Sequence, residues 1–376
     1  MSFNDLPDNC LWKIFENVHG VKDLVQLSKV CSRWSDLITL KFNRVKYLRL
    51  MTISDAVDYI DANSLWLNHA TNWNDYNLIK LFPNLKIIEV SSYSGVIIGS
   101  DILARILNDN PNIKGLIGLS NSIGKSFDLK NIEMCAAEFS FDFKKVFRHD
   151  QLKQVRCFYF FTYDLPAFIE YFPNLIRLNL ELDEADEVFY NGPNLSSLKI
   201  LELDTTDLVE QFTGFHFMDF CPSLESAFIH CWAYALYVDE SIKNYNLRDL
   251  VIVNTGFFSW SILRRLLSKF PNLHHLAIRH IDKLDDNNLE ELIKLLPNLK
   301  ILDLRGCKKM INKSADFPVK YCVKKNRSFE IYYDCKNEPT EWPKLVDTCE
   351  PICYGFDFMK HCFYKSLNCL PVLIDE

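Results

Sequence analysis

Hydrophobic residues recur at intervals of three and four along the first forty residues, which predicts amphipathic helices. The first helix is expected from about Pro7 to Val18, because Pro7 suits a first helical turn and Gly20 suits a stop. A second helical region follows, and no Gly or Pro shows whether it is one helix or two. The apolar stripe of the first helix consists of Leu11, Ile14, Phe15 and Val18, and that of the second region consists of Leu24, Leu27, Cys31, Trp34, Leu37 and Ile38.

After this region the chain carries a recurring unit of the form L-x-x-L-x-L, with copies spaced roughly 23 to 26 residues apart in its later part. This spacing is typical of one short strand followed by a returning helix, such as Trp260–Phe270 or Leu289–Leu296. The better copies are Leu85–Val90, Leu175–Leu180, Leu198–Leu203, Leu247–Ile252, Leu273–Ile278 and Leu299–Leu304, and degenerate copies begin at Val45, Ile113, Leu129, Leu152 and Leu224.

Each unit buries its apolar side only against its neighbours, so stacking predicts an α/β solenoid with a curved parallel sheet inside and helices outside. Four Pro-Asn pairs fit helix ends that turn into strands. The stretches 53–82 and 135–150 break the period, either through longer insertions or because the register differs there. The Pro-Asn pairs are Pro83-Asn84, Pro173-Asn174, Pro271-Asn272 and Pro297-Asn298.

The N-terminal segment resembles the F-box, whose pattern L-P-x-x-x-L-x-x-I-F, D-L-x-x-L and V-C-x-x-W it matches almost position for position. The resemblance implies a three-helix unit that docks on a Skp-type adaptor and, through it, on a cullin scaffold. It also implies that the matching residues build the adaptor contact or its supporting core, without separating the two roles. These residues are Leu6, Pro7, Ile14, Phe15, Leu24, Val30, Cys31 and Trp34.

The later units resemble the irregular leucine-rich repeats found behind an F-box, and Leu299–Cys307 comes closest to their cysteine-containing form. The domain prediction is an F-box in 1–42, a repeat solenoid in 43–310, and a tail in 311–376 that caps or packs on the last repeat. A competing interpretation makes residues 1–42 a plain helical cap on the solenoid, since a solenoid needs its first apolar end covered.

Composition narrows the function classes. A net charge of −7 argues against a general nucleic-acid binder, and the absence of a long apolar run argues against a membrane span. Met1–Gly20 lacks the features of a signal peptide, so the cytoplasm or nucleus is the expected location. Phosphate-loop, G-x-S-x-G and H-E-x-x-H motifs are missing, so we expect neither an enzyme nor a cofactor.

The 13 cysteines read as reduced thiols in such a location. Six of them gather near the C-terminus with His361, where a zinc site is the alternative to ordinary cysteines. Since no C-x-x-C pair is present, no metal site is predicted. The six are Cys322, Cys335, Cys349, Cys353, Cys362 and Cys369.

Positions that alternate with the buried leucines should line the open face of the sheet, where a protein substrate would bind. Their charge trend is acidic in the middle and basic at the end. A basic stretch from Lys308 to Arg327 follows the last repeat, and together with the basic face it would hold an acidic or phosphorylated segment, unless it is a solvated loop. The candidate substrate-binding residues are Arg156, Phe158, Arg177, Phe228, His230, His275, Arg279 and Arg305.

The sequence is compatible with three functions. The first is the substrate-recognition subunit of a Skp-cullin-F-box ubiquitin ligase, which contributes proximity while other subunits supply the chemistry. The second is an F-box scaffold that acts outside ubiquitination. The third is a free-standing repeat binder of the ribonuclease-inhibitor type.

Overall fold

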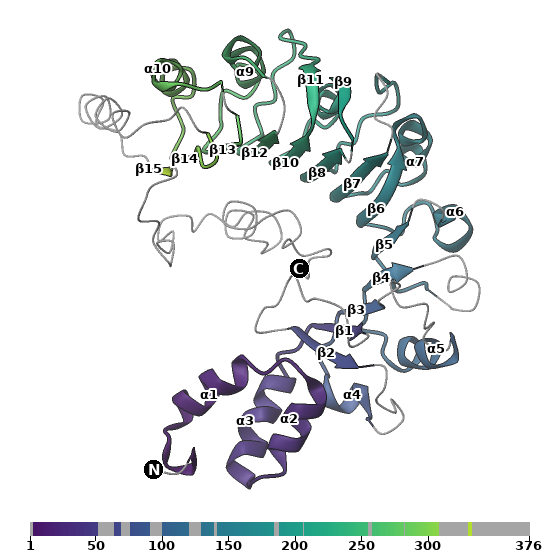
Figure 1. Cartoon of the computed structure of the whole chain (residues 1–376). Coiled ribbons are helices and arrows are strands. Elements are labelled where there is room, and N and C mark those ends of the chain that lie inside the picture. The colour runs from purple at the N-terminus through teal and green to yellow at the C-terminus, as the bar shows by residue number, and fades with distance from the viewer. Residues whose placement is uncertain are drawn as a thin grey trace. The chain divides into compact units, whose positions relative to one another are not determined.

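The computed structural model describes residues 3–51, 64–68, 76–90, 100–119, 129–138, 141–183, 188–205, 207–254, 258–281, 283–307 and 330–332. The chain divides into two compact units, an N-terminal unit that contains residues 1–152 and a C-terminal unit that contains residues 153–370. Each is built from parallel strands joined by helices or loops, so the α/β expectation is confirmed (Figure 1).

The N-terminal unit begins with a short 3-10 turn, η1 (Phe3–Asp5), and three helices, which we call the helical domain. The helix predicted over Pro7 to Val18 is confirmed as α1 (Asp8–Glu16). The second region is two helices, α2 (Val21–Ser28) and α3 (Ser32–Phe42), with the chain extended at Cys31 between them. Gly20 does not end α1 but precedes α2, where an added Cβ would lie 2.6 Å from the Asp23 carboxylate.

The sheet of this unit has the strand order β5-β4-β3-β1-β2. Its edge strand β2 explains part of the broken period in 53–82, because it is an extra strand that pairs with β1 on the side opposite β3. The backbone N–H of Trp66 on β2 donates to the His19 carbonyl at 2.9 Å, which fixes the helical domain to the sheet edge. The strands are β1 (Tyr47–Met51), β2 (Ser64–Asn68), β3 (Ile87–Val90), β4 (Gly115–Leu119) and β5 (Met134–Glu138), and the helices are α4 (Leu78–Leu81), α5 (Ser100–Asp109) and α6 (Phe143–Val146).

The C-terminal unit has the strand order β15-β14-β13-β12-β10-β8-β7-β6 and a small second sheet of β9 and β11. Its strands are β6 (Gln154–Phe161), β7 (Arg177–Asp183), β8 (Ile200–Thr205), β9 (Val209–Phe212), β10 (Ser226–Cys231), β11 (Ala233–Leu236), β12 (Asp249–Asn254), β13 (His275–Arg279), β14 (Ile301–Asp303) and β15 (Glu330–Tyr332). Its helices are η3 (Thr162–Asp164), α7 (Leu165–Tyr171), α8 (Gly214–Phe217), η4 (Met218–Phe220), α9 (Trp260–Leu267) and α10 (Asp286–Leu295).

One hydrogen-bond pattern recurs where strands begin. Two successive backbone N–H groups donate to a single carbonyl of the preceding unit. Ile176 and Arg177 donate to Lys153, for example, and His274 and His275 donate to Arg248, at distances between 2.7 and 3.1 Å. Because every such pair satisfies two donors at the start of a strand, it fixes the register between units.

Side chains of the predicted Pro-Asn turns add a second link between units. The Asn84 amide donates to the Asn43 carbonyl at 2.7 Å, and the Asn272 amide donates to the Tyr245 carbonyl at 2.8 Å. The asparagines therefore join neighbouring turns as well as forming their own.

The predicted leucine pattern matches the strands, and the leucines at its fourth and sixth positions are buried, as Leu178 and Leu180 show. One copy needs correction. Strands begin two residues after the first apolar position of a unit, and β5 begins at Met134, so that unit starts at Ile132 rather than Leu129. Both residues are buried, which is why the sequence alone did not distinguish them.

The basic stretch Lys308–Arg327 lies outside the described residues, as do the six C-terminal cysteines and His361. Of the predicted tail, the structure describes Glu330–Tyr332, which pairs in parallel with β14. These three residues extend the sheet by one strand.

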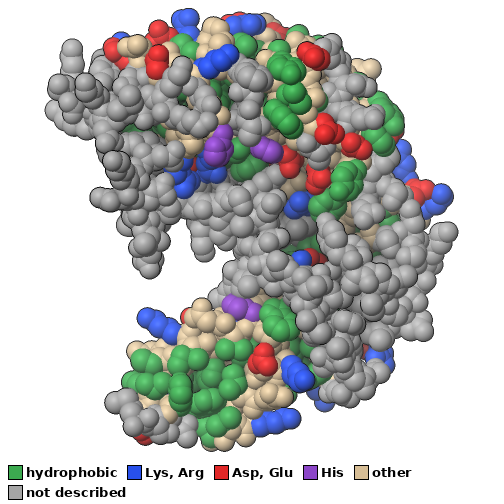
Figure 2. All heavy atoms as spheres, in the orientation of Figure 1, with side chains coloured by type: hydrophobic (Ala, Val, Ile, Leu, Met, Phe, Trp, Pro, Cys, Tyr) green, Lys and Arg blue, Asp and Glu red, His purple; other side chains and the backbone are tan. Residues whose placement is uncertain are grey.

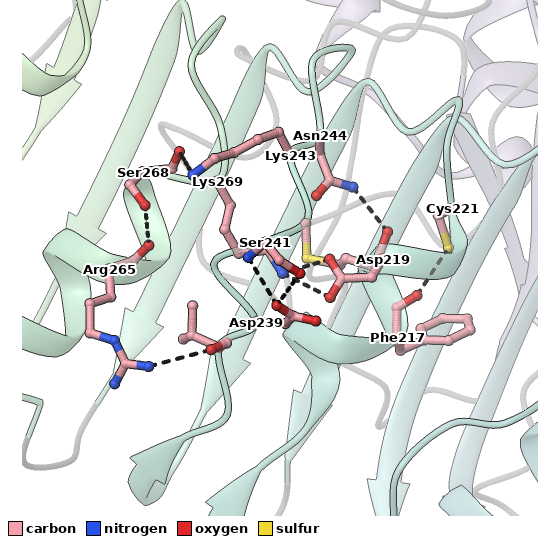
Figure 3. Close-up of polar contacts among 12 residues, drawn as sticks. Phe217, Asp219, Cys221, Asp239, Ser241, Lys243, Asn244, Arg265, Ser268 and Lys269 are labelled. Atoms are coloured by element: carbon pink, nitrogen blue, oxygen red, sulfur yellow. Dashed lines mark hydrogen bonds and ion pairs between the residues drawn. The ribbon is translucent and has the colours of Figure 1, made fainter.

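A buried ion pair lies within the C-terminal unit (Figure 3). It links the turn before β10 to the turn before β13, two strand repeats further along the chain. Lys269 donates to both carboxylate oxygens of Asp219 at 2.6 and 2.8 Å, and neither side chain is more than 1% exposed. Burial raises the pKa of Asp219, while the hydrogen bond from Lys269 opposes that rise. Asn244 joins the same region by donating to the Met218 carbonyl at 3.1 Å.

Replacing Lys269 by Met is expected to lower the free energy of unfolding by about 3–5 kcal/mol, because it leaves the Asp219 charge buried without its partner. Urea unfolding measures the change. The control is Arg265→Met, which removes the half-exposed pair with Glu240 and should cost at most about 1 kcal/mol. Equal losses in the two variants would contradict a special role for the buried pair.

Candidate functional site

The helical domain separates its residues into a core and an exposed set. Phe15 of α1 packs edge-on against Trp34 of α3, with ring centroids 5.2 Å apart. Leu11, Leu24 and Ile38 complete this core, and all three are fully buried. Of the residues expected to make or support an adaptor contact, Phe15, Leu24 and Trp34 therefore lie in the supporting core.

Three of the same set point outward. Ile14 is 41% exposed, Val30 is 56% exposed, and Pro7 is also exposed, whereas Leu6 and Cys31 are partly buried. Figure 2 shows hydrophobic side chains gathered on the surface of the region that holds α1 to α3. A gathering of exposed hydrophobic side chains on so small a helical domain is suited to contact with a protein partner.

Polar contacts fix the segment that leads into α1. Arg33 of α3 donates to the Asp8 carboxylate and to the Leu6 carbonyl, both at 2.6 Å. Arg44 lies 4.6 Å from the centre of the Trp12 ring, a cation–π arrangement. These contacts fix the start and the middle of α1 to α3 and to the residues that follow it, so α1 has a defined position in the helical domain.

Lys41, which the sequence analysis missed, closes the C-terminal end of α1. Its ammonium group donates to the carbonyls of Phe15, Glu16 and Val18 at 2.7, 3.0 and 2.7 Å, and its residue is 1% exposed. Burial lowers the pKa of Lys41 to about 8, against the opposing charge of Glu16. The sequence does contain an indication of this burial, because Lys41 follows Trp34 by seven residues and so lies on the buried side of α3.

The second candidate surface is the polar face of the sheet in the C-terminal unit. Arg177 of β7 and Glu202 of β8 form a two-pronged ion pair with distances of 2.7 and 2.9 Å. Their side chains are only 2% and 1% exposed. Arg177 was expected to be displayed on this face, but its charge is buried and satisfied within the sheet.

Histidines and carboxylates pair further along the face. His230 of β10 lies 2.5 Å from Asp204 of β8. His275 of β13 lies 2.6 Å from Asp249 of β12, which also accepts a hydrogen bond from Ser226 at 2.7 Å. His230 is about one-third exposed and His275 is nearly buried.

At the last described strands two arginines share one acid. Arg279 and Arg305 each donate to the Asp303 carboxylate at 2.8 Å, and Asp303 is 1% exposed. Burial favours a higher pKa for Asp303, but the hydrogen bond from Arg305 and the charges of both arginines hold the pKa below its ordinary value. Asp303 therefore offsets part of the positive charge of Arg279 and Arg305. This offset lowers the attraction that the basic end of the face would have for an acidic segment.

Arg156 and Phe158 of β6 lie together, with the guanidinium group 4.5 Å from the ring centre. Arg156 is partly buried, and among the described residues its Nε atom has no hydrogen-bond partner. Phe228 of β10 is 1% exposed, so it fills the face rather than standing out from it. The structure thus places the eight predicted residues on one unit, but leaves mainly Arg156, Phe158, His230 and Arg305 with exposed area.

The helical domain is similar to a known protein family. Residues 3–42 match the F-box-like family model. Domains of this family generally bind Skp-type adaptors. No curated protein matches the chain.

The described part of the chain lacks two features. None of its helices is long and apolar enough to cross a bilayer. Within the same ranges, no group of His, Cys, Asp and Glu side chains is arranged to hold a metal ion.

The buried lysine predicts a pH dependence of stability. Because the folded pKa of Lys41 is about 8 and its unperturbed value is 10.5, the unfolded chain binds more protons between these values. The free energy of unfolding should therefore gain on raising the pH from 8 to 10.5, by up to about 3 kcal/mol from this group. Below pH 8 that contribution is lost.

Lys41→Met removes this titration, so the difference in unfolding free energy between wild type and variant should change with pH in that window. Denaturant unfolding at several pH values measures it. Lys22→Met, which changes an exposed lysine of α2, is the control and should show the wild-type slope. Parallel slopes for wild type and Lys41→Met would contradict a perturbed Lys41.

Proposed function

We propose that this protein is the substrate-recognition subunit of a Skp-cullin-F-box ubiquitin ligase. The helical domain docks on the Skp-type adaptor and, through it, on a cullin scaffold. The sheet units are leucine-rich repeats, and their polar face holds a protein substrate. The chain itself is not an enzyme, because its contribution is to keep the substrate close to the ubiquitin-transfer machinery of other subunits. The cytoplasm or nucleus is the corresponding location.

The observation that carries this proposal is the F-box-like match over residues 3–42 together with the exposure of Ile14 and Val30. A plain cap would turn its apolar residues inward to cover the end of the sheet. Here α2 does lie beside the edge strand β2, yet two large apolar residues remain 41% and 56% exposed. Exposed apolar residues at this density favour a partner-binding surface over a cap.

The difference in burial between these residues also decides which of them can be mutated to test adaptor binding. Phe15 is 1% exposed and packs on Trp34, so a charge placed there would unfold the helical domain. A charge at Ile14 or Val30 disturbs no described core contact and acts on the surface alone. These two positions therefore report adaptor binding rather than folding.

Ile14→Asp combined with Val30→Asp is expected to weaken binding of the purified chain to a Skp-type adaptor by about 100-fold or more, because it puts two charges into a desolvated apolar contact. Isothermal titration calorimetry measures the affinity. The matched control is Ile242→Asp, since Ile242 is 38% exposed in the C-terminal unit. It should bind the adaptor as the wild type does.

Two outcomes would redirect the assignment. A folded wild type that fails to bind the adaptor would make the helical domain a cap and the protein a free-standing repeat binder. Adaptor binding without cullin recruitment, or without ubiquitin transfer to a captured protein, would indicate a scaffold that acts outside ubiquitination.

A further inference from the structure

Exposed aromatic side chains lie in β6 and directly after β10, at the two sides of the charged part of the sheet. Tyr159 of β6 is 55% exposed, and Trp232, which follows β10, is 41% exposed. Figure 2 shows hydrophobic, acidic and histidine side chains close together over this part of the molecule. Large aromatic residues exposed on one sheet face are candidates for contact with a ligand.

Tyr159 is presented by an irregularity of the strand. The register between β6 and β7 shifts between Cys157 and Phe160, so Phe158 and Tyr159 together lie opposite Glu181. Tyr159 has a φ of 54°, a left-handed conformation that aromatic residues seldom adopt. The bulge turns an aromatic side chain outward beside a carboxylate.

Two carboxylates occupy the middle of this face. Glu181 of β7 lies directly opposite Asp204 of β8, and Asp204 lies opposite His230 of β10. Trp232 comes two residues after His230, and its backbone N–H donates to the Thr205 hydroxyl at 2.9 Å. Glu181 and Asp204 therefore sit between Tyr159 on one side and Trp232 on the other.

The Glu181 carboxylate has no hydrogen-bond or ion-pair partner among the described residues. Burial raises the pKa of Glu181, and the neighbouring charges of Asp204 and Asp183 add to the rise while Arg156 opposes it. Burying a carboxylate beside a second one is unfavourable unless a cation approaches. Glu181 is thus a charge that a bound partner can stabilise.

The charge balance selects the kind of partner. Arg156 and Arg177 supply two positive charges to this part of the face, and Arg177 is already engaged by Glu202. The negative charges are Glu181, Asp183, Glu202 and Asp204, so carboxylates exceed guanidinium groups. A Lys or Arg side chain of a partner gains ion-pair attraction from these surplus carboxylates.

We infer that this face, from β6 to β10, binds a basic, Lys- or Arg-containing segment of a partner protein. Where that partner is the substrate of the ligase, this inference rests on the proposed function. A cationic side chain lies against Glu181 and Asp204, and the aliphatic part of the segment packs on Tyr159 and Trp232. This site lies in the acidic middle of the face. It is distinct from the basic end at β13 and β14, for which an acidic segment is expected, and there Arg279 and Arg305 lie beside Asp303.

Strand geometry sets the length of the segment. From β6 to β10 the sheet has three strand-to-strand steps, in the order β6, β7, β8 and β10. At about 4.8 Å a step this distance is about 14 Å, which about four extended residues span. Recognition accordingly needs a short basic motif rather than a folded basic domain.

The experiment uses the full chain, alone and with its adaptor, and two fluorescein-labelled ten-residue peptides of equal length and leucine content. One peptide carries Lys and Arg at the polar positions, and the other carries Glu and Asp. Fluorescence anisotropy measures both affinities. The basic peptide is expected to bind at least about tenfold more tightly than the acidic one, and stronger binding of the acidic peptide would overturn the inference.

Variants locate the binding. Glu181→Gln with Asp204→Asn keeps the shapes of both side chains and should weaken the basic peptide about tenfold, and Trp232→Ala should weaken it about fivefold. The matched control is Glu170→Gln with Glu240→Gln, which removes two exposed charges elsewhere on the unit and should change the affinity less than twofold. Equal effects of the two pairs would mean nonspecific attraction and overturn the inference.

The experiments distinguish a failure of this inference from a failure of the proposed function. Adaptor affinity, measured on the same samples, depends on Ile14 and Val30 and should not change in the Glu181 and Asp204 variant. Adaptor binding without any preference for the basic peptide would reject this inference alone. Peptide binding in a chain that does not bind the adaptor would leave the basic-segment site in place and reject the ligase assignment.

Discussion

The structure depends on one constraint: each strand unit can bury its leucines only by stacking on the next. A single unit has one apolar side and no opposing layer of its own. The shared carbonyl at strand starts, such as that of Lys153 for Ile176 and Arg177, ties this burial to a fixed parallel register. The strand order, the apolar core and the contacts between turns therefore all follow from the stacking of one repeat on the next.

Stacking in register also determines what the other side of the strands displays. Side chains at equivalent positions come to lie opposite one another on adjacent strands, as Glu181 does with Asp204. Charges brought together in this way must pair or repel, and most of them pair, as Arg177 does with Glu202. Glu181 is left without such a partner among the described residues, although the charge of Arg156 lies near it.

The helical domain meets the stacking constraint differently, because three short helices have little core to share. It gains support from β2, to which His19 is hydrogen-bonded through Trp66, and from Lys41, which satisfies three carbonyls at the end of α1. These supports free Ile14 and Val30 from the core. The same domain can thus be anchored to the sheet and still present an apolar surface.

The sequence by itself determined the helices of residues 3–42, most strand positions and the identity of the buried leucines, because periodicity reports directly which side of an element avoids water. It also supplied the F-box pattern. Only the tertiary structure showed that Phe15 is buried while the neighbouring Ile14 is exposed. It also showed the buried contacts of Lys41, the bulge at Tyr159, and the ion pairs of Arg177 and Arg279. Exposure and charge pairing depend on residues brought together from different units, and no local pattern records those distances.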